Sequence, residues 1–227
     1  MSIIETGKTQ KYLIYAVGEV VLVVIGILLA LQINNWNEWS KDRAKEKVIL
    51  NEIVASLEKN NQAIVERMYW VERFKKSGKT IIQVLEEEIP YSDTLNAYFL
   101  NCRFSGLGNL QGLMTDAGYN ALRLAGYDII QSDSLKMQII EMFDSTIPVL
   151  SGMESGIRSK FQDYYFQHFK HGQIPRNLDQ LKNDPIYYEM VNFLIGFRVR
   201  ALNRMQQFLD QSNGLIDIIK EELTRIE

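Results

Sequence analysis

The chain has 227 residues, of which 46% are hydrophobic and 23% are charged, and its formal net charge is −3. This length can bury a real core, and ordinary charge content with only four prolines excludes a disordered, collagen-like or low-complexity chain. The acidic side chains outnumber the basic ones by 28 to 25, which argues against nucleic acid as a partner. The single cysteine, Cys102, excludes an internal disulfide framework and a cysteine-built zinc site.

The first predicted element is a transmembrane helix over residues 12–34, which follows an N-terminal tail of residues 1–11. About 22 apolar residues with one charge form a helix of ~33 Å at ~1.5 Å per residue, enough to cross a hydrocarbon core of about 30 Å. The run is too long for the apolar part of a cleaved signal peptide, and no small-x-small cleavage site follows it. Aromatic residues at both ends are the predicted interface anchors: Tyr12, Tyr15, Trp36 and Trp39.

One carboxylate and three small residues inside this span form the predicted helix-contact site. Glu19 lies ~10 Å inside the span, where an ionised carboxylate costs a few kcal/mol, so we expect it to be protonated, hydrated or paired with another helix. Gly18, Gly26 and Ala30 are spaced at multiples of four residues, and Gly26-x-x-x-Ala30 would let a second helix approach closely. The alternative, a tolerated polar residue and the usual glycine content of membrane helices, stays open.

Residues 35–78 are predicted to form a long amphipathic stalk helix that continues the span and ends at Ser77-Gly78. Apolar residues recur there every seven positions: Leu50, Leu57, Ile64 and Val71. A second row lies three residues after the first; Ile53 and Phe74 belong to it, and Asn60 and Arg67 interrupt it. This stripe packs either inside the chain or between chains.

Residues 79–227 are predicted to be a soluble bundle of about six helices, because no strand alternation and no repeat is found. The fold class is therefore all-α, with one N-terminal transmembrane helix, a stalk and a bundle. The expected helices, in chain order, cover Thr80 to Ile89; a segment from Ser92 or Asp93 that carries Leu95, Tyr98, Phe99 and Cys102; Thr115 to Ala125, closed by Gly126; a segment capped by Ser132 or Asp133; a segment ending at Phe169; and Pro185 to Glu227, capped by Asp184.

No catalytic, cofactor or metal site is predicted. Residues 76–80 resemble the end of a phosphate-binding loop, but Arg73 stands where that motif requires glycine. His168 and His171 are spaced for one helix face, yet a catalytic zinc site requires a third protein ligand. The aromatic neighbours of these histidines predict a docking face instead, made of Tyr164, Tyr165, His168 and Phe169.

Two further features leave alternatives open. Arg198, Arg200 and Arg204 could gather on one side of the last helix and bind an anion, although arginines on a helix surface more commonly snorkel. The glycine-rich stretch from Ser105 to Gly112 is either a partner-binding loop or a connector, and we favour the connector.

The run YAVGEVVLVVIGILLALQINNWNE, from Tyr15 to Glu38, resembles the N-terminal signature of an uncharacterised family of membrane-anchored helical bacterial proteins. A second patch, Gly118 to Gly126, is similar to an internal segment of that family. The resemblance implies a single-pass inner-membrane protein whose C-terminal domain is periplasmic, and it implies no reaction. A count of lysine and arginine beside the span slightly favours the opposite orientation.

These observations predict a membrane-anchored helical interaction or scaffold protein that is not an enzyme. Its expected partners are the lipid bilayer and either a second copy or other membrane-protein subunits. The alternative function is a sensory helical bundle that binds a small ligand in the periplasm.

Overall fold

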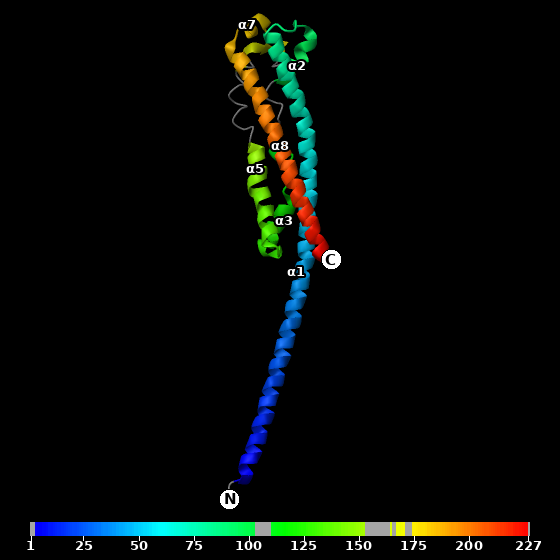
Figure 1. Ribbon diagram of the computed structural model, residues 1–227, viewed down its shortest axis with the longest axis vertical. Coiled ribbons are helices and arrows are strands. Elements are labelled where there is room, and N and C mark those ends of the chain that lie inside the picture. Colours follow the sequence, from blue (N-terminus) through cyan, green and yellow to red (C-terminus); the bar gives the residue numbers. More distant parts are fainter. Residues whose placement is uncertain (1–2, 103–109, 153–163, 165–166, 171–173, 227) are drawn as a thin grey trace. The chain divides into compact units, whose positions relative to one another are not determined.

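The structure is a computed structural model that describes residues 3–102, 110–152, 164, 167–170 and 174–226. Side chains are described from residue 15 onward, apart from those at 111, 170 and 174. The chain divides into two units, Met1–Val48 and Ile49–Glu227. Helix α1, Ile3–Leu85, contains most of the first unit and the beginning of the second (Figure 1).

The all-α prediction is confirmed, with one two-residue strand pair as the exception in the described part of the chain. After α1 the elements are η1 (Asp93–Leu95), α2 (Asn96–Cys102), η3 (Leu110–Gly112), α3 (Ala117–Ala125), η4 (Tyr127–Ile129), α4 (Asp133–Glu141), the π-helix η5 (Met142–Thr146), α5 (Ile147–Ser151), β1 (Phe169–Lys170), β2 (Ile174–Pro175), α7 (Leu178–Lys182) and α8 (Pro185–Ile226).

The seven-residue stripe packs inside the chain. Its four members are fully buried in a core shared with residues of α3, α4, α5 and α8. Contacts between α1 and α8 pair residue 58 with 220, 61 with 213 and 74 with 198, so the two helices run antiparallel and side by side (Figure 1). The alternative that this stripe forms an interface between chains is therefore not needed to explain its pattern.

The prediction that the long helix ends at Ser77-Gly78 is wrong, because α1 continues to Leu85. Glycine serves there for close packing: a Cβ on Gly78 would lie 2.8 Å from Cγ1 of Ile195 on α8. The Ser77 hydroxyl donates to the Arg73 carbonyl at 3.0 Å, within the same helix. The separate helix expected from Thr80 is the end of α1.

A polar docking site joins the N-terminus of α3 to α1 and explains why Asn60 interrupts the second row of apolar residues. Nδ2 of Asn60 donates to the Thr115 carbonyl at 2.9 Å, and Oδ1 accepts from the Thr115 backbone N–H at 2.7 Å. The Ser56 hydroxyl accepts from the backbone N–H of Gly118 at 3.1 Å. Both side chains thus satisfy backbone groups beside the start of α3, which begins at Ala117 rather than at Thr115.

A π-helix separates α4 from α5. The predicted Ser132 cap is confirmed, since its hydroxyl accepts from the Leu135 N–H at 3.3 Å. Further on, the Ile147 N–H bonds to the Met142 carbonyl, five residues back. Pro148, which follows, has no N–H to donate and its ring crowds the carbonyl four residues earlier, which gives a physical cause for the widened turn.

The prediction that a helix continues through Phe169 is wrong, because Phe169 begins β1, which pairs antiparallel with β2. Phe169 is buried, with its ring centroid 6.2 Å from that of Phe99 and 5.7 Å from that of Tyr187. The predicted start of α8 is confirmed: Pro185 is its first residue. The Ile186 N–H donates to Oδ1 of Asp184 at 2.9 Å, which caps the helix.

Candidate functional site

The first candidate site is the exposed apolar part of α1. Every residue from Tyr15 to Asp42 is exposed, and the large apolar side chains between positions 15 and 33 are 47% to 77% exposed. Within the described chain, α1 is the one helix that by length and composition could cross a membrane. The described part of the chain does not cover this apolar surface.

The predicted contact residues and anchors lie on this surface. A Cβ added to Gly18 or Gly26 would meet nothing within 4 Å, so the small-residue face is open along α1. Glu19 and Ala30 are exposed beside it. Of the anchors, Tyr15, Trp36 and Trp39 are exposed, and the Tyr12 side chain lies outside the described residues.

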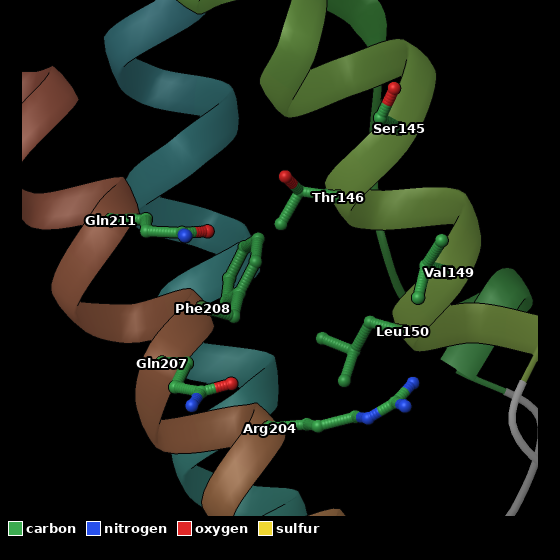
Figure 2. A pocket seen from close by; sticks show the side chains of 8 residues that line it. All are labelled: Ser145, Thr146, Val149, Leu150, Arg204, Gln207, Phe208 and Gln211. Carbon is green, nitrogen blue, oxygen red and sulfur yellow. The ribbon is translucent and has the colours of Figure 1, made fainter.

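The second candidate site is a groove between α8 and the segment formed by η5 and α5. One cavity in it measures about 390 Å³ and is lined by Ser145, Thr146, Val149, Leu150, Arg204, Gln207, Phe208 and Gln211. Figure 2 shows Thr146 and Leu150 facing Phe208 across the groove, with Arg204 extended past Leu150. A neighbouring cavity of about 260 Å³ shares Thr146 and Gln211 and reaches Glu141 and Ile218. The two cavities adjoin at these two shared residues, and together they are called the groove below.

Arg198, Arg200 and Arg204 of α8 do not gather into one anion site. Arg198 is 2% exposed, and its guanidinium donates to the carbonyls of Phe74 and Cys102, each at 3.1 Å. Arg200 and Arg204 are exposed, and only Arg204 lines the groove. Arg198 is therefore a structural residue that joins α1, α2 and α8.

The predicted docking face is only partly described. Tyr164 and His168 are half-buried and stack with their ring centroids 4.3 Å apart. Phe169 lies in the core, and Tyr165, like His171, is outside the described residues. The stretch from Ser105 to Gly112 is also largely outside them. No group of three or more His, Cys, Asp or Glu side chains that could hold a metal is found in the part searched, which is the described part.

Asp184, at the start of α8, is predicted to make the stability of the folded protein depend on pH. Burial opposes its charged form, but the hydroxyl of Tyr164, the backbone N–H groups of Ile186 and Tyr187, and the charge of His168 hold its pKa below the ordinary value of 3.8. A depressed pKa in the folded state adds stability that is complete above the ordinary value and disappears as the pH falls below it. Asp184→Asn keeps a capping oxygen but cannot lose a charge. We therefore expect this variant to lack the loss of stability at acid pH that Asp184 causes, as measured by urea titrations from pH 6 to pH 2.5.

The matched variant Asp184→Ala should lower the free energy of unfolding by about 1 kcal/mol at pH 7, because the cap itself is lost. If Asp184→Asn and the wild type lose stability in parallel below pH 4, the proposed role of this carboxylate is wrong.

The fold and the two candidate sites define an all-α protein with one N-terminal helix that could cross a membrane. Residues 19–89 match a family of unknown function, DUF6090, a match that begins at Glu19 and ends just beyond α1. The expected resemblance to an uncharacterised family is confirmed to that extent. No curated protein and no solved structure matched the chain.

Proposed function

We propose that this protein is a membrane-anchored helical interaction protein and not an enzyme. It passes once through a bacterial inner membrane, with the unit Ile49–Glu227 in the periplasm. It associates there with a second copy or with other membrane-protein subunits.

The observation that carries this proposal is the exposure of the apolar run in α1. A core helix of a soluble protein buries its large apolar side chains, whereas those between Tyr15 and Ile33 are at least 47% exposed. At roughly 25 cal/mol per Å² of apolar surface, leaving this run in water would cost many kcal/mol. Lipid or a partner helix must cover it, and its length suits a bilayer.

The contact through α1 is proposed from the small residues and the carboxylate. Helices in lipid associate by close backbone approach and by interhelical hydrogen bonds, because lipid removes the hydrophobic drive between them. Gly18, Gly26 and Ala30 leave open space along the helix, and a partner helix could offer Glu19 a hydrogen-bond donor.

The first experiment is membrane fractionation of the full-length protein. We expect it to stay in the pellet after carbonate washing and ultracentrifugation and to enter the supernatant only with detergent. Mass spectrometry should find the chain intact from its first residues. Recovery as a soluble monomer, or a chain cut after the apolar run, would overturn the anchor.

The second experiment tests the contact in mild detergent by analytical ultracentrifugation and partner recovery. Gly26→Leu and Glu19→Gln should each weaken association by about tenfold, because one blocks close approach and the other removes a strong acceptor. The matched control Val24→Leu adds bulk on the opposite face and should leave association unchanged. Equal association of all three variants would refute this contact face.

The groove between α5 and α8 favours a second candidate function, a helical bundle that senses a small ligand. Its larger cavity falls within the about 300–1,000 Å³ that is usual for ligand pockets. It combines an apolar floor with a few convergent polar groups.

A further inference from the structure

The groove between η5–α5 and α8 changes from charged at one end to mostly apolar along the rest of its length. Its lining on α8 runs from Arg204 to Ile218, fourteen residues, or ~21 Å at ~1.5 Å per residue. Apolar side chains form the floor over this distance: Leu150 and Phe208 in the first cavity, Met142 and Leu215 in the second. The guanidinium of Arg204 lies at one end.

Among the described residues that line the first cavity, Arg204 is the only charged one. Within the described chain no ion pair or hydrogen bond occupies its guanidinium. Gln207 and Gln211 follow it on α8 and add amide groups to the lining, while Figure 2 shows Leu150 beside its side chain and the hydroxyls of Ser145 and Thr146 farther along the groove. Such a set suits one carboxylate or phosphate, which guanidinium and amide groups bind through charge-assisted hydrogen bonds.

The nearest carboxylate of the π-helix does not compete for Arg204. Oδ2 of Asp144 accepts a hydrogen bond from the Tyr119 hydroxyl at 2.7 Å, and the Tyr119 hydroxyl lies 3.1 Å from that of Tyr127. Burial, and then this hydrogen bond to Asp144, raise the pKa of Tyr119 above its ordinary value. Asp144 is thus engaged with α3, while its neighbours Ser145 and Thr146 line the groove.

The other end of the groove is unsuited to an anion. Glu141 lines the second cavity beside Gln138 and Ile218, and its carboxylate would repel a second negative group. The lining between the two ends is mostly apolar. A ligand with one anionic head and an apolar chain fits this order, whereas a ligand with an anionic group at each end or a cation-headed amphiphile does not.

We propose that this groove binds an amphipathic anion, with its head on Arg204 and its linear apolar chain over Phe208 and Leu150 toward Leu215. The inference gives the second candidate function its ligand class and rests on that candidate. It does not depend on the membrane anchor, because every lining residue belongs to the unit Ile49–Glu227.

The test is equilibrium dialysis of labelled octanoate against the full-length protein in lipid nanodiscs, with empty nanodiscs subtracted. We expect saturable binding of one octanoate per chain. Octanamide, which has the same chain and no charge, should bind at least tenfold more weakly. Octyl phosphate in place of octanoate distinguishes a lipid-like phosphate head from a free acid, and saturable binding of either one supports the proposal.

Two variants locate the binding. Arg204→Gln should weaken octanoate binding at least tenfold, and the matched control Arg200→Gln, also exposed on α8, should not. Val149→Glu places a carboxylate at the groove on a residue that is 59% exposed, so the fold should tolerate it while binding is lost. The corresponding control is Val65→Glu, at a position 56% exposed on α1.

Uptake that does not saturate above empty nanodiscs would overturn the proposal. So would binding that survives both Arg204→Gln and Val149→Glu, or octanamide binding as tight as that of octanoate. If fractionation recovers the protein in the supernatant without detergent, the same dialysis is carried out without nanodiscs, so the two proposals fail separately.

Discussion

Replacing Gly118 by alanine is expected to lower the free energy of unfolding of the unit Ile49–Glu227 by about 3 kcal/mol. An added Cβ would lie 2.5 Å from the carbonyl carbon of Glu52 and from the nitrogen of Ile53, both in the backbone of α1. A helix backbone cannot rotate away as a side chain can. The start of α3 must therefore move off α1, and the hydrogen bond from the Gly118 N–H to Ser56 is strained with it.

Two other glycines serve as controls for this substitution. Gly214→Ala, inside α8 with nothing within 4 Å of the new Cβ, should stabilise the protein by about 0.5–1 kcal/mol through helix propensity. Gly78→Ala should change the free energy of unfolding by an amount between these two, because the atom nearest the added Cβ belongs to the Ile195 side chain and not to backbone.

The measurement for this series is urea-dependent labelling of Cys102, the only cysteine, in the full-length protein. Its thiol is fully buried in the folded state, so labelling reports unfolding. If Gly118→Ala matches Gly214→Ala, the close approach of α3 to α1 is wrong.

Local patterns in the sequence were enough to predict the helices and several of their ends. The seven-residue recurrence of Leu50, Leu57 and Ile64 identified the buried face of α1, and these side chains are fully buried. Ser132 and Asp184 were recognised as caps because capping depends on residues only two or three positions away. Such signals are contained within one helix, so they can be found without the fold.

Features that depend on distant residues could not be predicted in the same way. Gly78 was read as a helix end because glycine often ends helices, but α8 approaches it from more than a hundred residues away. Asn60 looked like a flaw in an apolar stripe, yet it pairs with the backbone of Thr115. Phe169 belongs to a strand of only two residues, which is too short to give an alternating pattern in the sequence.

The two candidate sites differ in the same way. The apolar run of α1 is continuous in sequence, so its residues were named in advance. The groove draws its lining from two segments about 60 residues apart, and only Arg204 had been considered as an anion ligand. The one local signal near the groove was Pro148. It has no backbone N–H, and it follows the π-helix that borders both cavities.

Arg198→Met is expected to lower the free energy of unfolding by about 3 kcal/mol, because the side chain joins three helices from a buried position. Its guanidinium donates to the carbonyl of Phe74 in α1 and to that of Cys102, the last residue of α2. It also lies 5.7 Å from the ring centroid of Phe74. Hydrogen bonds from a charged group contribute about 1.5–3 kcal/mol each, and methionine keeps an unbranched apolar side chain while it removes both.

In this variant the Cys102 carbonyl would be left without its hydrogen bond from Arg198, and this loss should matter more than the one at Phe74. A carbonyl at the end of a helix has no partner within the helix, whereas the Phe74 carbonyl lies in the interior of α1. We therefore expect faster amide exchange in α2 than in α1 when Arg198→Met is compared with the wild type by mass spectrometry. Arg200→Met, two residues on and exposed, should stay within about 0.5 kcal/mol of the wild type. A similar small effect for Arg198→Met would mean that the buried guanidinium does not hold α2 against α1 and α8.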